Sequence, residues 1–130
     1  MTGYQVCVAI GALLLVGMGM LHILLILGLP LGEFVLGGQY KAIPSNLRYR
    51  NGIFAIVFVA VATLYLERAG LLAFNIPVTF LNAAITAFLL FLVGATILNF
   101  AITKSAKEKW IMGPLTVLTG LSGLLAVLRG

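Results

Sequence analysis

Charged and chemically reactive side chains are scarce in this sequence of 130 residues, which has three acidic residues, one histidine and one cysteine. A single cysteine excludes an internal disulfide. So few ligand-forming residues make no set for a metal ion, and no nucleophile stands beside a base. Phosphate-loop and dinucleotide fingerprints are also missing. The sequence therefore predicts no catalytic residue, no metal and no cofactor, and it favours a protein that is not an enzyme.

Hydrophobic residues dominate instead: they make up 62% of the chain, charged residues make up 8%, and the mean hydropathy is +1.20. Such a composition cannot surround one water-soluble core, and crossing a bilayer takes about 20 apolar residues. The first apolar run has no Lys or Arg before it and is too long for a signal core, so we expect it to be retained. Four charge-free stretches are candidate membrane spans: residues 4–28, 51–66, 77–102 and 110–128.

The predicted fold class is all-α, with a single membrane domain over residues 1–130. We expect four transmembrane helices in a bundle made of two hairpins, 1–68 and 69–130, with a Gly/Pro-rich and partly embedded segment after the first helix. The acidic residues fall between the expected spans rather than within them. Because a proton- or cation-coupled carrier ordinarily uses an acid inside the membrane, this pattern argues against such a carrier.

Small residues indicate which helix faces pack, because close approach of backbones drives helix association where lipid competes for apolar contacts. The first span has Gly19 on a line with His22. In the last span, small residues recur at three- and four-residue steps: Gly113, Thr116, Gly120 and Gly123. We expect both faces to be buried against neighbouring helices.

The single histidine, His22, lies inside the first span. Counting from the helix ends places it level with Thr96 and Asn99 of the third span, which runs in the same direction. A neutral imidazole bonded to a neighbouring Thr, Asn or carbonyl is the simpler interpretation, and ligand binding or proton handling is the alternative. These three residues are candidate ligand-binding or lipid-binding residues.

The connection between the first two spans concentrates glycine and charge at one membrane exit. Its candidate residues for binding a lipid or another ligand are Glu33, Gly37, Gly38, Tyr40, Lys41, Arg48 and Arg50. Glycine amides beside basic side chains can hold an anion such as a lipid phosphate. The simpler interpretation is a helix end whose basic residues anchor the chain to headgroups. Both interpretations remain open.

Residues 30–40 of this connection combine groups that suit neither water nor lipid. The apolar run 34–36 is unfavourable in water, whereas the glycines and the acid are unfavourable against lipid. We therefore expect this segment to be ordered, partly embedded and folded back against the bundle. We also expect Glu33 to pair with Arg48 or Arg50 near the cytoplasmic mouth of the bundle, below His22.

The same connection resembles that of a group of small four-span membrane proteins of bacteria. The similar positions here are Gly28, Pro30, Gly32, Gly37, Gly38, Tyr40, Pro44 and Arg48, and later in the chain Asn99, Ser105, Glu108 and Pro114. The resemblance covers most of the chain through short motifs. It implies a bacterial inner (plasma) membrane, and because the group is uncharacterised and has no assigned activity, it implies no mechanism.

Three classes of function fit the sequence. A non-catalytic accessory or interaction protein, which binds lipid or a membrane partner or forms a homo-oligomer, requires the least further chemistry. A passive channel or uncoupled transporter would need an oligomer or a polar seam, whose candidate residues are Thr79, Asn82, Thr86, Thr96, Asn99 and His22. A membrane enzyme acting on a lipid or quinone would need His22 and Glu33 to act together across Pro30.

The eight basic residues are distributed unequally between the two sides of the expected bundle. Loops 29–50 and 103–109 hold six of them, and the other side holds Arg68 and Arg129. Because Lys and Arg in short loops stay cytoplasmic, both loops are expected inside and both termini outside. The net charge of +5 then suits anionic lipid headgroups rather than nucleic acid.

Reporter fusions test this orientation. A phosphatase that works only outside the cytoplasm should be active when it is fused after Gly130, because the charge asymmetry places that end outside. The same phosphatase inserted after Lys104 should be inactive. Activity after Gly130 of a cytoplasm-specific reporter alone would contradict the orientation.

Overall fold

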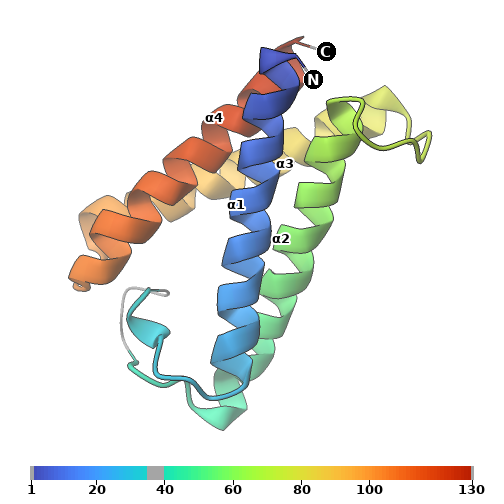
Figure 1. Cartoon of the computed structure of the whole chain (residues 1–130). Helices are drawn as coiled ribbons and strands as arrows, with labels where there is room; N and C mark the ends of the chain where they lie inside the picture. The colour runs from blue at the N-terminus through green and yellow to red at the C-terminus, as the bar shows by residue number, and fades with distance from the viewer. Residues whose placement is uncertain (1, 35–39, 130) are drawn as a thin grey trace.

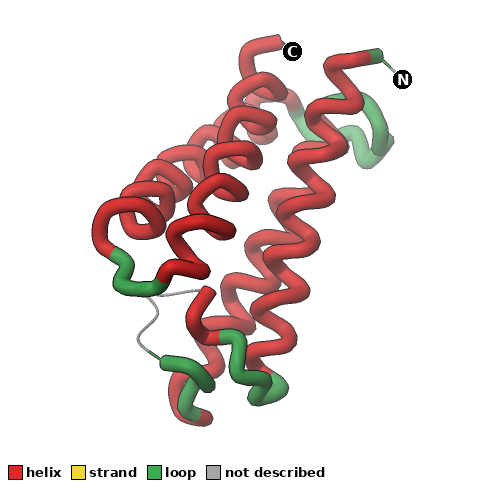
Figure 2. Tube along the Cα trace, turned by 60° about the vertical axis from the view of Figure 1, so that its left-hand side comes forward, coloured by secondary structure: helices red, strands yellow, loops and turns green. Residues whose placement is uncertain are grey.

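Helices form most of this structure, a computed structural model that describes residues 2–34 and 40–129 apart from the side chains of Glu33 and Arg129. Two short 3-10 turns, η1 Gly32–Phe34 and η3 Ser45–Leu47, precede the second long helix. Two π-helical turns, η4 Leu98–Ile102 and η5 Glu108–Met112, border the last connection. Among the residues described there is no strand (Figure 2). The long helices (Figure 1) are α1 Gly3–Ile26, α2 Arg48–Arg68, α3 Val78–Ile97 and α4 Gly113–Arg129.

All four long helices, with the turns next to them, are long and apolar enough to cross a membrane, so the chain is a multi-pass membrane protein. The helix α2 extends beyond the expected run 51–66 at both ends, because Arg48 and Arg68 are themselves helical. Long basic side chains allow this, since their stems cover apolar surface while their charged heads stay at the interface. The membrane-crossing stretches are Gly3–Ile26, Ser45–Arg68, Val78–Ile102 and Glu108–Leu128.

The helix ends follow local sequence signals. Thr2 and Gln5 form a reciprocal capping box at the start of α1, with hydrogen bonds of 3.1 and 3.2 Å. Gly28 ends that helix with a φ of 91°, a conformation that costs little without a side chain, and Pro30 prevents its continuation. Pro77 directly precedes α3. These signals define the two hairpins.

In each hairpin, a glycine of one helix lets it pack closely against the other half of the hairpin. In the first, a Cβ on Gly19 of α1 would lie 3.2 Å from Val59 Cγ2 and 3.4 Å from the carbonyl oxygen of Ala55, both in α2. In the second, a Cβ on Gly113 would lie 2.8 Å from the ring of Phe100. The prediction of a four-helix bundle made of two hairpins is confirmed.

Tyr65 of α2 joins both hairpins near the chain termini. Its side chain is fully buried, and its hydroxyl donates to the carbonyl oxygen of Thr119 over 2.9 Å. Two glycines allow the helices to approach this closely. A Cβ on Gly123 would collide with the Tyr65 hydroxyl, and a Cβ on Gly11 would collide with Ser122. We call this contact of Tyr65 with Gly11, Ser122 and Gly123 the Tyr65 notch. It brings α1, α2 and α4 together through close packing.

The helices α1 and α4 separate as they run away from this notch (Figure 1). A groove of about 390 Å³ lies between their other ends. The segment after α1 occupies part of this space, since Phe34 of η1 packs against core residues of the bundle. The chain then turns back, because the Gly32 amide donates to the carbonyl oxygen of Lys41 over 2.8 Å. The prediction of a partly embedded segment is confirmed for these described ends, while residues 35–39 lie outside the described residues.

Gly123→Leu should destabilise the fold by about 1–3 kcal/mol, because its side chain would overlap the buried Tyr65 ring and separate α4 from α2. Gly17→Leu is the matched control, since a Cβ there meets nothing within 4 Å. Thermal unfolding in detergent measures both. Equal melting temperatures for the two variants would contradict the role of the Tyr65 notch.

Candidate functional site

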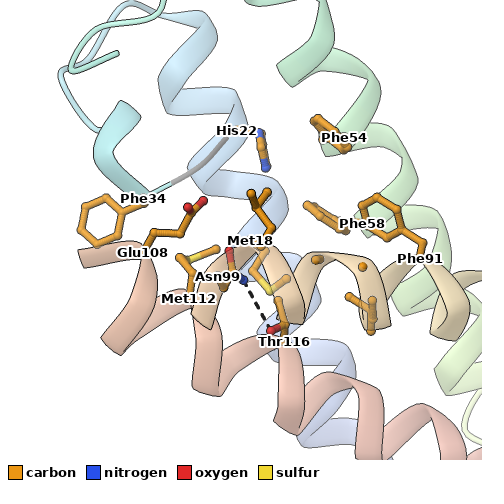
Figure 3. A pocket seen from close by; sticks show the side chains of 14 residues that line it. Met18, His22, Phe34, Phe54, Phe58, Phe91, Asn99, Glu108, Met112 and Thr116 are labelled. Carbon is orange, nitrogen blue, oxygen red and sulfur yellow. Dashed lines mark hydrogen bonds between the residues drawn. The ribbon is translucent and has the colours of Figure 1, made fainter. Parts of the chain in front are cut away.

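A pocket of about 290 Å³ lies inside the separated end of the bundle (Figure 3). Side chains from α1, α2, α3 and α4 line it, together with residues of η1, η4 and η5. Phe91 and Gly94, which line it, are exposed on the surface of α3, so the pocket is open on that side of the bundle. Its polar lining residues are His22, Asn99, Glu108 and Thr116. We call this cavity the central pocket.

The His22 side chain is held in place by a hydrogen bond to Asn51 of α2. Its Nδ1 lies 2.9 Å from Oδ1 of Asn51, and both side chains are buried. In the tautomer that makes this bond, the imidazole donates from Nδ1 to the amide oxygen and keeps a lone pair on Nε2, while the Asn51 amide nitrogen is buried without a partner among the residues described. The sequence pointed to His22 and missed Asn51, which falls at the first position of the expected second span. The pair supplies the central pocket with one fixed hydrogen-bond acceptor.

Aromatic rings form the wall next to His22 (Figure 3). The imidazole centroid lies 5.1 Å from that of Phe54 and 5.4 Å from that of Phe58. The ring centroids of Phe54 in α2 and Phe91 in α3 are in turn 6.1 Å apart. Tilted and edge-on arrangements at these separations are favourable ring contacts. The result is a wall of π-faces next to a polar group.

Asn99 and Thr116 connect α4 to the end of α3. The Thr116 hydroxyl donates to the carbonyl oxygen of Gly113 over 2.7 Å and accepts from the Thr96 hydroxyl over 3.1 Å. It also accepts from Asn99 Nδ2 over 3.5 Å, as the dashed line in Figure 3 marks. The structure thus places His22, Asn99 and Thr116 around one cavity, with Thr96 bonded directly behind it. The hydroxyl hydrogens of Thr96 and Thr116 and one hydrogen of the Asn99 amide nitrogen point at protein acceptors.

Glu108 is a further site residue that the sequence did not predict. Its side chain is 2% exposed, lines the central pocket and begins the fourth membrane-crossing stretch. Glu108 lies two positions before the expected span 110–128, and its buried side chain weakens the argument against a coupled carrier.

The reason Glu108 points inward is the π-helical turn that follows it. The Gly113 amide donates to the Glu108 carbonyl oxygen, five residues back, and this wider turn aligns Glu108 with Met112 on the inner face. Such turns are common at functional sites. The sequence did contain a signal: Glu108 precedes Thr116 by eight positions, with Met112 midway, so it continues the buried stripe of α4.

The predicted residues of the first connection lie mostly away from this pocket. Arg48 donates from Nε to the carbonyl oxygen of Ile43 over 2.9 Å, and Lys41 is exposed. Tyr40 is partly buried, and Arg50 Nε is buried without a partner among the residues described. The Glu33 side chain and both Gly37 and Gly38 lie outside the described residues, and the expected Glu33–arginine pair lies there too.

The polar seam proposed for a channel is not continuous in the part of the monomer that the structure describes. Thr79 and Thr86 are exposed on the outside of α3, and Asn82 accepts from Arg68 Nε over 2.8 Å at the end near the termini. Only His22, Asn99 and the Thr96–Thr116 pair gather at the central pocket. The residues of the expected seam are therefore divided between the outside of α3 and the two ends of the bundle.

No protein-family model, curated protein or solved structure matches this chain. Functional inference therefore rests on the chemistry of the central pocket itself.

A double-mutant cycle tests the His22–Asn51 contact. His22→Phe and Asn51→Leu should each destabilise the fold, because each leaves one buried polar partner without its bond. The double variant should be less destabilised than the sum, with a coupling of about 0.5–1.5 kcal/mol, since both polar groups are then gone. Equilibrium unfolding in detergent measures the four proteins. Additive losses would mean that the two side chains are not bonded.

Proposed function

We propose that this chain is a non-catalytic integral membrane protein that binds one amphipathic small molecule, a lipid or a lipid-like compound, in the central pocket. The observation that supports this most is a cavity at membrane depth with aromatic walls and a few convergent polar groups, His22, Asn99 and Glu108. Ligand sites in proteins have this composition, with apolar walls for affinity and sparse polar groups for orientation.

The size and surroundings of the central pocket favour a headgroup rather than a whole lipid. Its volume of about 290 Å³ lies just below the usual range for ligand sites, about 300–1,000 Å³. Two apolar grooves share its walls. One, of about 400 Å³ between α3 and α4, includes Leu92 and Thr116, and the other, between α1 and α4, includes Met18 and Met112. A hydrocarbon chain attached to the bound headgroup would lie along one of these grooves.

Access from the membrane fits such a ligand. Phe91 is 43% exposed and Gly94 is exposed on α3, so a compound dissolved in the bilayer can reach the pocket without crossing water. We infer a bacterial inner membrane, with both termini outside, from the resemblance and from the basic loops. Those loops would contact anionic headgroups, and a membrane-protein partner or a second copy remains compatible with the exposed apolar helix faces.

A passive channel or uncoupled transporter, formed by an oligomer, is the second candidate. It is favoured by one observation only, the exposed Thr79 and Thr86 on one side of α3, which a second copy would have to cover. Solute flux in liposomes distinguishes it from a binding protein. The binding function requires no second copy, because the central pocket is complete within one chain.

Native mass spectrometry of the protein extracted from its membrane tests the binding function. A bound amphipathic molecule should remain with the wild-type protein, and Gly94→Phe should reduce its occupancy about tenfold, because a ring at this open lining position would enter the central pocket. Leu90→Phe is the matched control, since Leu90 lies on the same helix and is 71% exposed. Equal retention by both variants would exclude the central pocket as the binding site.

A further inference from the structure

Resting on that proposed function, we propose that the headgroup taken by the central pocket is a protonated amine carried on an apolar chain. The pocket combines three features that select such a cation: fixed hydrogen-bond acceptors, a buried carboxylate and π-faces. Each comes from a different part of the bundle, and together they favour one class of headgroup over the other common ones.

The acceptors follow from the bonds that the lining residues already make. His22 donates from Nδ1 to Asn51, which leaves the Nε2 lone pair as its remaining polar group. Thr116 uses its hydrogen on the Gly113 carbonyl oxygen, and Asn99 directs its amide nitrogen at Thr116. Besides the second hydrogen of the Asn99 amide nitrogen, what these residues can still offer a ligand is Nε2 of His22 and Oδ1 of Asn99. Both groups accept, so a ligand that is bonded here has to bring the donors.

Glu108 adds negative charge to this set. Its carboxylate lies in the central pocket with Phe34 and Asn99 (Figure 3), and its side chain is 2% exposed. A carboxylate has about four lone-pair sites, so it can bond a ligand in addition to its protein neighbours. Away from water, attraction between this charge and a cation is much stronger than at a surface.

The aromatic wall completes the selection. Phe54, Phe58 and Phe91 present ring faces and edges around the space next to His22. A cation near a phenylalanine face is stabilised by the ring quadrupole, by about 0.5–2 kcal/mol depending on how dry the site is. The same rings contact the carbon atoms next to the amine. The Lys107 ammonium, 5.6 Å from the Phe34 ring centroid, is an instance of this contact within the protein.

Other headgroups match this chemistry poorly. A phosphate or carboxylate headgroup would bring negative charge to Glu108 and acceptors to acceptors. A quinone offers only carbonyl acceptors, so His22 Nε2 and Asn99 Oδ1 would face it without a donor. An ammonium group has three donors and no acceptor. If Glu108 holds a proton before binding, transfer of that proton to a neutral amine produces the same ion pair, with no other reactant.

Two probes of equal chain length test the proposal: dodecylamine and dodecanol, each titrated into the protein in phosphatidylcholine nanodiscs and measured by native mass spectrometry. The wild-type protein should bind the amine at least about tenfold more tightly, which corresponds to one charged hydrogen bond of about 1.5 kcal/mol or more. Glu108→Gln should reduce this preference to about threefold or less. Glu67→Gln is the matched control, because Glu67 accepts from the Phe74 amide in the α2–α3 connection and should keep the full preference.

The outcomes separate the two proposals. Equal binding of amine and alcohol by the wild-type protein, blocked in both cases by Gly94→Phe, would overturn the amine headgroup and leave the binding function intact. Binding of neither probe would overturn both. A full amine preference in Glu108→Gln would exclude the carboxylate as its cause, and if that variant does not fold, the wild-type comparison of amine with alcohol still decides.

Discussion

The close packing of α1, α2 and α4 around Tyr65 is the constraint on which the rest of the structure depends. A side chain at Gly11 or Gly123 would overlap Ser122 or the tyrosine, so the backbones meet only because both residues lack one. Helices that are tied together at one end and diverge from there leave a space at the other. The central pocket occupies this space, and Phe34 of η1 covers one side of it.

Lipid offers no hydrogen bonds, so the polar groups inside the bundle have to find partners within the protein. His22 with Asn51, and Thr96 with Asn99 and Thr116, meet this condition with neighbours from adjacent helices. His22 and Thr116 use their donor hydrogens on the protein, the Asn51 amide nitrogen is buried without a partner among the residues described, and acceptors of His22 and Asn99 line the same cavity as Glu108. Under the proposed function, these acceptors together with Glu108, rather than the volume of the cavity, would select the ligand.

Composition predicted the four spans. Gly28, Pro30 and Pro77 predicted the helix ends, and with them the two hairpins and the embedded segment, because glycine and proline restrict the conformation of adjacent residues. The inward direction of Glu108 depends instead on a π-turn closed by the Gly113 amide, and a count of charges along the chain does not contain that information. Asn51 was treated as the edge of a span, although the helix begins at Arg48. The positions of His22, Asn99 and Thr116 therefore followed from helix faces and matching depths, whereas Asn51 was not predicted and Glu108 was signalled only by its spacing from Met112 and Thr116.

Photo-crosslinking tests the central claim, that a ligand lies inside the separated end of the bundle, most directly. A twelve-carbon amine with a diazirine near its headgroup, irradiated with the protein in nanodiscs and mapped by peptide mass spectrometry, should label lining residues such as Leu98 and Met112. An excess of unlabelled dodecylamine should remove that labelling. Labelling confined to exposed positions such as Ile56 and Leu90, which are 72% and 71% exposed, and unaffected by the competitor would contradict the account.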